Sequence, residues 1–270
     1  MITSGEIDKI ARKQNIEPIV IEKDFVITWV LYGISKHEKL RENLAFKGGT
    51  VLKKNYFEDY RYSEDLDFTL IDEGISNEEI LEAFAECLEY VSDESGLILQ
   101  INPDKEKVHK PTGSLKFIIN YVAPLKAALD NRYLKVDVTR GEIIEFDLQE
   151  RPVFYEYSDI PEDFQVKCYS LSEVLIEKMT AVMGRTIPRD IYDLWYLFEC
   201  EGLDLADHNI EFESKARNKG HDPAQFREKL ENTEATYKRD WETSLGKQIK
   251  DLPDFKDVMR ELNKHLRKFY

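Results

Sequence analysis

Residues 46–70 of this 270-residue chain contain the side chains whose types and spacing are best suited to chemistry. Gly48, Gly49 and Thr50 follow a short apolar run and precede a segment of helical composition. Two glycines permit a tight turn, and the backbone N–H groups and hydroxyl at a helix N-terminus form a place for a phosphate. This stretch therefore predicts a phosphate-binding turn between a strand and a helix.

Asp65 and Asp67 lie in an alternating segment that follows the turn. The alternation predicts a half-buried strand with both carboxylates on one face and Leu66 and Phe68 in the core. Two close carboxylates repel unless a cation lies between them, and Mg²⁺ typically binds carboxylates together with substrate phosphates and water. A lone double glycine usually marks a turn and a lone Asp-x-Asp a solvated strand face, but their combination is expected by chance in roughly one chain in a thousand. The combination predicts phosphoryl or nucleotidyl transfer.

A second group of charged candidates lies on two predicted helices, one over residues 174–184 and one that begins with an N1 proline. Lys178 and Arg185 are seven residues apart and share a face. Arg189 and Asp193 have the i,i+4 spacing of a surface ion pair, which contributes little stability alone. A further carboxylate, that of Asp190, lies one turn before Asp193.

The elements that must position these side chains form an α+β pattern. The longest apolar run, residues 25–34, is about half a bilayer span, so we expect a buried amphipathic helix and no membrane segment. Helices are predicted over 3–14, 18–36 and 76–91, β segments over 97–101, 114–122, 133–139 and 151–157, a polar loop over 104–110, a loop up to about 167, and three or four helices after 206.

The net charge of −15 is unusual for a protein that binds nucleic acid, and it makes a basic partner worth considering. A local basic patch can still act, because salt screens charges beyond about 8 Å. The candidate patches are Lys53-Lys54, Arg61, residues 105–110 and residues 264–268.

The cysteines are few and far apart, without CxxC spacing. This pattern predicts core thiols in a reducing cytoplasm and supports neither a disulfide framework nor a zinc site. The residues are Cys87, Cys168 and Cys200.

Gly48-Gly49-Thr50 followed by Asp65-Leu66-Asp67 resembles the first motif of the DNA polymerase β-type nucleotidyltransferase superfamily. Lys47 before the glycines and Arg61-Tyr62-Ser63-Glu64 before the aspartates narrow the resemblance to the AbiEii/AbiGii toxin family of nucleotidyltransferases, as does Glu22-Lys23-Asp24-Phe25. The string from Glu177-Lys178-Met179 through Arg185 to Arg189-Asp190-Ile191-Tyr192-Asp193-Leu194 is similar to the third and fourth motifs of that family. The resemblance covers residues 20–200 and is loose beyond them.

The resemblance implies a polymerase β-type core, a small mixed sheet with flanking helices, plus a helical bundle domain. We accordingly expect an N-terminal helical flank over residues 1–40 and the nucleotidyltransferase core over 41–165. A C-terminal helical domain over 166–270 would contribute Lys178 and Asp190 to the site.

The resemblance also implies roles for individual residues. Two Mg²⁺ ions would be bound by Asp65, Asp67 and Asp137, the last from strand 133–139, with Glu142 as the alternative third carboxylate. Asp190 would complete the site, with Asp193 as the alternative. The nucleotide would be bound by Lys47, Gly48, Gly49, Thr50, Arg61, Ser63 and Lys178, and the catalytic group would be Asp65, Asp67, Asp137, Lys178 and Asp190.

By resemblance, the protein is the cytoplasmic toxin of a toxin–antitoxin or abortive-infection system. It would transfer NMP from an NTP to RNA, such as the 3′ end of tRNA, and an antitoxin would be its partner. Two other functions stay open. The acidic charge gives some weight to nucleotidylation of a protein or small molecule as the runner-up. A non-catalytic regulator that binds nucleotide or a partner would be indicated by loss of a carboxylate or of the turn, and this sequence contains both.

Overall fold

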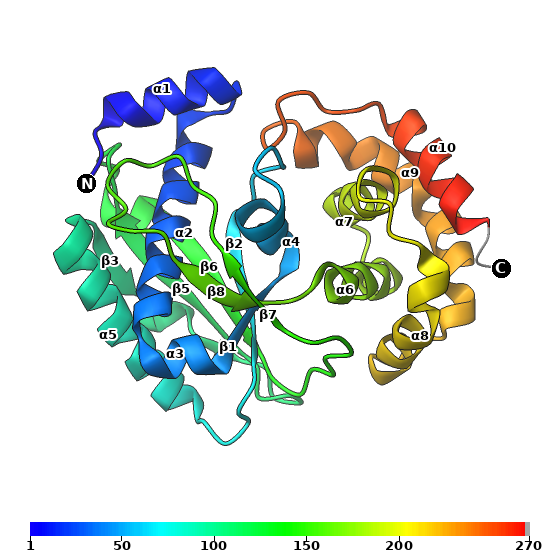
Figure 1. The fold of residues 1–270 in the computed structure, drawn as a ribbon, viewed down its shortest axis with the longest axis horizontal. Helices are drawn as coiled ribbons and strands as arrows, with labels where there is room; N and C mark the ends of the chain where they lie inside the picture. Colours follow the sequence, from blue (N-terminus) through cyan, green and yellow to red (C-terminus); the bar gives the residue numbers. More distant parts are fainter. Residues whose placement is uncertain (268–270) are drawn as a thin grey trace. The chain divides into compact units, whose positions relative to one another are not determined.

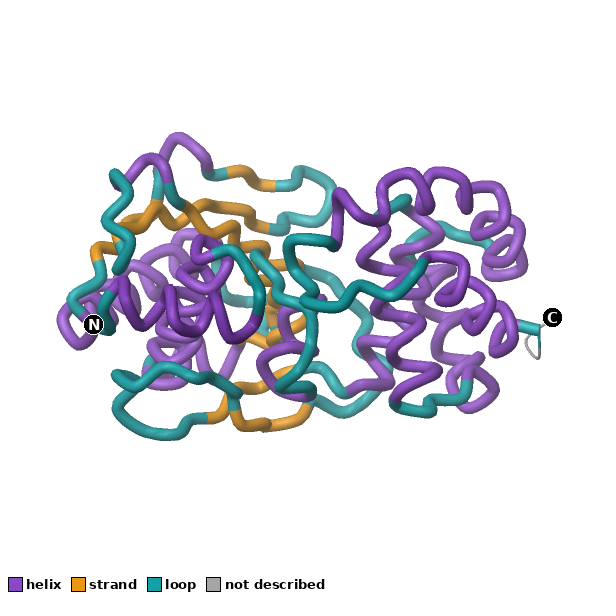
Figure 2. Tube along the Cα trace, turned by 90° about the horizontal axis from the view of Figure 1, so that it is seen from above, coloured by secondary structure: helices purple, strands orange, loops and turns teal. Residues whose placement is uncertain are grey.

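In the computed structural model, which describes residues 1–267, the chain forms two compact units. Unit 1 comprises residues 1–142 and 148–168, and unit 2 comprises residues 143–147 and the chain from Tyr169 onward. Strands occur in unit 1, whereas the described part of unit 2 consists of helices and loops (Figure 2). Lys268 of the predicted C-terminal basic patch and the last three residues of the predicted helical domain lie outside the described residues.

Unit 1 is built around a mixed eight-stranded sheet with the strand order β3-β5-β6-β2-β1-β8-β7, and β4 pairs with β5. The strands are β1 (Leu44–Lys47), β2 (Asp65–Leu70), β3 (Ile98–Ile101), β4 (Lys107–Val108), β5 (Leu115–Val122), β6 (Tyr133–Thr139), β7 (Gln149–Pro152) and β8 (Gln165–Cys168). Strand β2 is parallel to β6 and antiparallel to β1, and β1 is parallel to β8. The two strands that carry the predicted carboxylates, β2 and β6, are therefore neighbours.

Helix α5 covers one face of this sheet (Figure 1). Phe84 of α5 lies 5.0 Å from Phe117 of β5 and 6.3 Å from Phe68 of β2, measured between ring centroids. Because alternate side chains of a strand point to opposite faces, the polar positions of β2 and β6 lie on the other face. The helices of unit 1 are α1 (Ser4–Gln14), α2 (Pro18–Lys36), α3 (Glu38–Asn43), α4 (Gly48–Val51), which a π-helical turn over Leu52–Tyr56 continues, and α5 (Asn77–Ser95).

Helix α2 is buried on almost every side, so the prediction of an amphipathic helix is wrong. Between Val20 and Ile34 all residues are buried except Lys23, which is half-buried. A helix buried on all sides lies inside the core, and the polar residues Glu22, Asp24 and Thr28 are buried with its apolar ones. Gly33 lets α2 approach α5 closely, because a Cβ at this position would lie 2.4 Å from Cγ2 of Val91.

The predictions for three strands, β3, β5 and β6, are confirmed to within one residue. The strand predicted over 151–157 begins at Gln149 and ends at Pro152, and the predicted loop before residue 167 contains β8. Strand β8 is short and partly polar, and it pairs with β1, with Phe46 opposite Cys168. Such a strand depends on a distant partner, which a local pattern does not reveal. The expected polar loop over 104–110 likewise contains β4.

Aromatic contacts join the helices of unit 2. Trp241 of α9 lies 6.4 Å from Tyr192 of α7 and 5.3 Å from Phe255 of α10, between ring centroids. The helices are α6 (Leu171–Gly184), α7 (Pro188–Trp195), α8 (Asn209–Asn218), α9 (Phe226–Leu245) and α10 (Phe255–Leu266). The last three confirm the helices expected after residue 206.

A buried ion pair holds residues 143–147 within unit 2. The carboxylate of Glu173 on α6 accepts hydrogen bonds from the backbone N–H groups of Glu145, at 2.8 Å, and Phe146, at 2.9 Å. The Nζ of Lys215 on α8 donates to the same carboxylate and to the carbonyl oxygen of Ile143. Satisfied in this way, the two buried charges fix a loop segment that has no secondary structure of its own.

Two of the three cysteines lie in the core as predicted. Burial raises the pKa of both Cys87 and Cys168 to about 12. Cys200 is exposed, so the prediction of a core thiol there is wrong. Within residues 1–267, no helix combines the length and the apolar character that crossing a membrane requires.

Candidate active site

A row of charged residues crosses five strands of unit 1. In the sheet register Lys47 of β1 is opposite Asp67 of β2, Asp67 is opposite Asp137 of β6, Asp137 is opposite Lys116 of β5, and Lys116 is opposite Lys107 of β4. Directly opposite residues point to the same face, with Cβ atoms about 5 Å apart. The three predicted metal-binding carboxylates therefore share one face, because Asp65 precedes Asp67 by two residues on β2.

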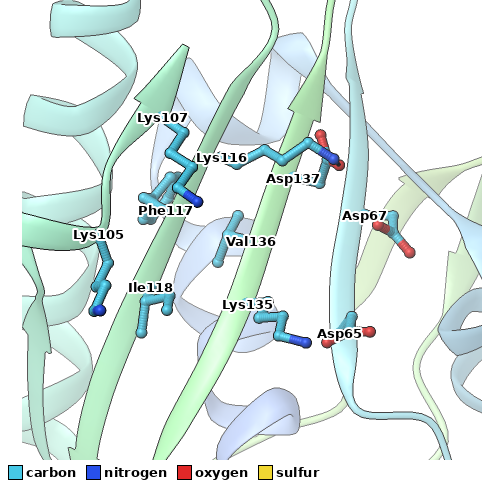
Figure 3. Close-up of a pocket in the computed structure, with 10 residues that line it drawn as sticks. All are labelled: Asp65, Asp67, Lys105, Lys107, Lys116, Phe117, Ile118, Lys135, Val136 and Asp137. Carbon is cyan, nitrogen blue, oxygen red and sulfur yellow. Dashed lines mark hydrogen bonds and ion pairs between the residues drawn. The ribbon is translucent and has the colours of Figure 1, made fainter. Parts of the chain in front are cut away.

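The carboxylates line a hollow of about 340 Å³ on this face. Figure 3 shows Asp137 beside the Nζ of Lys116, Asp65 near Lys135, and Asp67 directed away from β6. The side chains that line the hollow are Asp65, Asp67, Lys105, Lys107, Lys116, Phe117, Ile118, Lys135, Val136 and Asp137. The site thus combines carboxylates with lysines on neighbouring strands.

The double glycine is required by two close approaches. Gly48 has a φ of +78°, and a Cβ built there would lie 2.5 Å from Oδ2 of Asp67. A Cβ at Gly49 would lie 2.2 Å from Nη2 of Arg61, whose side chain is buried. Only glycine combines this φ with these contacts at low cost. The turn after β1 is therefore packed against a predicted metal ligand on one side and a buried guanidinium on the other.

Thr50 and Ser63 connect the turn to the start of β2. The hydroxyl of Thr50 lies 2.6 Å from the carbonyl oxygen of Asp65 and 2.7 Å from Oγ of Ser63. Both hydroxyl-bearing residues are buried. In this structure the Thr50 hydroxyl is engaged by the protein itself, and it fixes Asp65 relative to the glycines.

Glu142, the alternative third carboxylate, lies beside Lys47. The Nζ of Lys47 is 3.4 Å from Oε1 of Glu142, and both side chains are buried. Lys47 follows Phe46 at the end of β1 and stands opposite Asp67, so its ammonium belongs to the same charged face. The structure therefore places Glu142 next to Lys47, the residue of the charged row that precedes the glycine turn.

Asp137 already has a cationic partner in this structure. The Nζ of Lys116 forms an ion pair with Oδ2 of Asp137. Among the described residues, no three Asp, Glu, His or Cys side chains are gathered closely enough to form a metal site. The donor set itself fits Mg²⁺, because it consists of carboxylate oxygens on adjacent strands that face one hollow. To bind a shared ion, the Asp137 carboxylate has to turn away from Lys116, and the Asp67 carboxylate has to turn toward β6.

The prediction that Lys53-Lys54 and Arg61 form exposed basic patches is wrong, because Lys54 and Arg61 are buried. Lys54 is 1% exposed, and its Nζ lies 2.6 Å from Oδ2 of Asp24 and 2.9 Å from Oγ1 of Thr28. Burial lowers the pKa of Lys54, although the adjacent Asp24 charge opposes this shift. Tyr157 also donates to Asp24, at 2.7 Å. This network anchors the π-helical turn that follows the glycines to helix α2.

Lys178, Asp190 and Asp193 form a compact buried cluster in unit 2. The Nζ of Lys178 on α6 lies 3.0 Å from Asp190 and 2.8 Å from Asp193, both on α7. The guanidinium of Arg185 forms two hydrogen bonds with Asp190, at 2.7 and 2.9 Å. Burial alone would raise the pKa of Asp190, but Lys178 and Arg185 outweigh it and hold that pKa below its ordinary value.

The structure, which describes residues 1–267, shows no ion pair between Arg189 and Asp193, although their i,i+4 spacing predicted one. Asp193 instead forms an ion pair with Lys178. Both candidate aspartates thus contact the same lysine. The geometry brings Lys178, Asp190 and Asp193 together without choosing between the two carboxylates.

Sequence reasoning missed Lys116 as part of the site. Its signal is present, since Lys116 is the one charged residue of a mostly apolar strand. The pairing of β5 with β6 is what puts it opposite Asp137, and that register follows from the folded sheet. Lys135 lies on the same face of β6 as Asp137, which it precedes by two residues.

The comparisons with known proteins concern the family and the fold of the chain. The family model described as "Nucleotidyl transferase AbiEii toxin, Type IV TA system" matches residues 29–261. JHP933 from Helicobacter pylori is similar in structure, with a TM-score of 0.60 and 15% identity over 94% of this chain and 92% of that one. MenT4, a nucleotidyltransferase toxin from Mycobacterium tuberculosis, gives a TM-score of 0.54 and 18% identity over 73% of this chain and 64% of MenT4.

At these identities the solved structures show a shared fold, and with it the predicted α+β class with a mixed sheet and helical remainder is confirmed. No curated protein matches the chain.

Proposed function

Since the chain belongs to the AbiEii nucleotidyl transferase toxin family of type IV toxin–antitoxin systems, we propose that it transfers NMP from an NTP to a hydroxyl of RNA, with the 3′ end of tRNA as acceptor. One observation supports this choice of site. The Gly48 turn contacts Asp67, which is opposite Asp137 on the same face of the sheet. A phosphate-binding turn next to clustered carboxylates is the arrangement that nucleotidyl transfer needs.

Asp65, Asp67 and Asp137 would hold two Mg²⁺ ions. When bound, such ions lower the pKa of the acceptor hydroxyl and neutralise charge on the triphosphate. The acceptor oxygen then attacks the α-phosphorus in line with the leaving pyrophosphate.

The residues around the turn orient the triphosphate. We propose that the backbone N–H groups after Gly48 and Gly49 bind the β- and γ-phosphates. Arg61, packed on Gly49, and Thr50, which lies between Ser63 and Asp65, keep the turn in place. Lys47 adds positive charge at the end of β1.

Lys178 is proposed, from the family motif, to offset charge on the leaving pyrophosphate. Its ammonium is fixed by Asp190 and Asp193, which would hold it in one orientation. Asp190 remains the first choice for the family aspartate, because it also binds Arg185. An antitoxin encoded with the toxin would be the partner that restrains the activity.

The proposal is tested by incubating the purified protein with total tRNA, Mg²⁺ and each NTP in turn, labelled at the α-phosphate. We expect label on tRNA with the unchanged protein and none with Asp65→Ala or Asp67→Ala, because each change removes a metal ligand from the polar face. Folding should be retained, since both carboxylates are only half-buried. The control is Asp93→Ala, which removes an exposed carboxylate of α5 and should leave the transfer unchanged.

Label transfer by Asp67→Ala at the rate of the unchanged protein would contradict the two-metal assignment. Pyrophosphate release in a cell lysate without label on tRNA would replace RNA with a protein or small-molecule acceptor. The absence of both signals would contradict transfer itself.

A further inference from the structure

We propose that four lysines beside the carboxylates bind the phosphodiester backbone of the acceptor RNA strand. These residues, here called the lysine surface, are Lys105, Lys107, Lys116 and Lys135. The inference rests on the proposed function, because it takes the neighbouring carboxylates as the reaction centre. It adds to that function where the acceptor lies and which chemical groups hold it.

The charge at this place is opposite to that of the whole molecule. The chain carries a net charge of −15, yet the ten residues that line the hollow include four lysines and three aspartates. Side chains of Lys105, Lys107 and Lys135 form no hydrogen bond or ion pair with any residue in the described part of the chain. Lysines that line one hollow together create a local positive potential, which attracts an anionic ligand even to a protein of negative net charge.

The order of the strands gives the lysine surface a direction. The glycine turn follows β1, the carboxylates are on β2 and β6, and the lysines are on β6, on β5 and in the segment that contains β4. If the triphosphate lies at the turn, the leaving pyrophosphate is on the β1 side. In-line displacement places the attacking oxygen opposite the leaving group. The acceptor therefore has to arrive from the side of β5 and β4, where the lysines are.

The spacing of the lysines suits an extended chain of phosphates. Lys107 is two strands away from Asp137, or about 10 Å, whereas Lys135 is two residues along the same strand, or about 7 Å. Lysines spread in both directions from Asp137 can contact successive phosphates of a nucleic-acid strand, which presents a phosphate at every nucleotide.

An exposed aromatic ring lies on the same face. Tyr133, Lys135 and Asp137 alternate along β6, and Tyr133 is 42% exposed. The Nζ of Lys23 lies 5.5 Å from the centroid of its ring. A basic surface combined with an aromatic platform is the usual composition of single-strand binding sites, because each base can stack on the ring. This feature favours RNA over an acidic protein segment or an isolated polyphosphate.

The test measures RNA binding without transfer. A short single-stranded RNA with a fluorescent label and no terminal 3′ hydroxyl is titrated with the protein in the absence of NTP, at several salt concentrations. The variants are the triple change Lys105→Gln, Lys107→Gln, Lys135→Gln and, separately, Tyr133→Ala. The matched control changes Lys9, Lys238 and Lys256 to Gln, which alters the net charge equally; these lysines are exposed and form no ion pair with any residue of the range 1–267.

We expect the unchanged protein and the control to bind the RNA with the same salt dependence. In the triple variant the slope of log K against log salt should decrease by about 2, since each phosphate contact on a single strand contributes about 0.7. Tyr133→Ala should weaken RNA binding by roughly fivefold or more, as expected for one lost stacking contact. Its affinity for inorganic tripolyphosphate should not change.

Three results would overturn the inference. The triple variant could bind the RNA with the slope of the unchanged protein, or the control could lose as much affinity as the triple variant. Weakened binding of free NTP, with RNA binding unchanged, would assign the lysines to the triphosphate instead. Because the RNA lacks a reactive hydroxyl, these results are independent of whether Asp67→Ala abolishes transfer, and the proposed function is judged by that variant alone.

Discussion

The two glycines of the turn meet different neighbours. Gly48 combines a left-handed backbone with the carboxylate of Asp67, whereas Gly49 faces the guanidinium of Arg61. A methyl group at either position would displace a charged side chain that the site needs. At the residue scale, the active-site geometry thus depends on the absence of two side chains as much as on the presence of the carboxylates.

Replacement of Gly48 by Ala tests this dependence. The left-handed backbone costs an alanine roughly 1–2 kcal/mol, and the overlap with Asp67 adds roughly 1–3 kcal/mol unless the carboxylate moves. The added methyl group displaces either the turn or the Asp67 carboxylate, and we expect both displacements to abolish nucleotidyl transfer. Chemical denaturation and the labelled-NTP assay measure the two effects.

Gly96 is a matched control for this substitution. It has a φ of +75° at the end of α5, and a Cβ built there would have no neighbour within 4 Å. Gly96→Ala should therefore show the backbone cost alone, with full transfer activity. If Gly48→Ala keeps full activity, the close approach of Gly48 to Asp67 is not needed for transfer. If it destabilises the protein no more than Gly96→Ala does, the close approach does not affect stability either.

Sequence alone identified the residues of the turn and the paired aspartates, because their spacing is distinctive. It could not show that the Thr50 hydroxyl binds the backbone of Asp65, or that Lys54 is buried against Asp24. Both contacts join segments that are far apart in sequence or separated by a loop. The residue types were informative, but their partners were determined by the fold.

The alternation of polar and apolar residues predicted β5 and β6 well, because each strand buries apolar side chains and exposes a lysine on the other face. The register between strands was beyond prediction, and it is the register that aligns Lys47, Asp67, Asp137 and Lys116 in one row. Strand β8 was missed for a related reason, since its stability comes from pairing with β1. At the scale of elements, local pattern predicts strands, whereas the site is created by their pairing.

The contact between α6 and α7 depends on a shared buried cation. Asp190 and Asp193 approach Lys178 from one helix, and Arg185 closes the cluster at Asp190. Removing one member of a buried charge group leaves the others uncompensated, which typically costs about 3–5 kcal/mol. The cluster therefore stabilises the helix pair as well as orienting Lys178.

Asp190→Asn should lower the free energy of unfolding by about 3 kcal/mol at neutral pH, because an amide cannot compensate Lys178 and Arg185. The pKa of Asp190 lies below its ordinary value of 3.8 in the folded protein, so its stabilising effect is complete above pH 3.8 and is lost as the pH falls through the lower folded value. The difference between the two proteins should be constant from neutral pH to about pH 5 and shrink below pH 3.8.

Denaturant titrations at a series of pH values measure this difference. Asp207→Asn, at an exposed position of unit 2, is the control and should change stability little at any pH. A loss below about 1 kcal/mol at neutral pH would contradict the role of the cluster, because exposed pairs contribute no more than that.

The division into two units predicts how the whole molecule unfolds. Chains that form more than one compact unit commonly depart from two-state unfolding. Scanning calorimetry should therefore show two transitions. Gly48→Ala, in unit 1, should lower one of them, and Asp190→Asn, in unit 2, should lower the other.

A single transition that both substitutions lower equally would show that the units unfold as one. Gly96→Ala serves as a further marker, since it lies in unit 1 and should move the same transition as Gly48→Ala by a smaller amount.

The order in which the strands are made has a consequence for synthesis on the ribosome. Strand β1, which leads into the glycine turn, has β8 as one of its two neighbours, and about 120 residues lie between Lys47 and Gln165. At a synthesis rate of about 5–20 residues per second, a nascent chain exposes that edge of β1 for roughly 6–24 seconds. Unpaired strand edges pair with strands of other chains, so the growing polypeptide is open to aggregation at this edge during the interval. A truncated translation product that ends before β8 should therefore aggregate rather than act as a toxin.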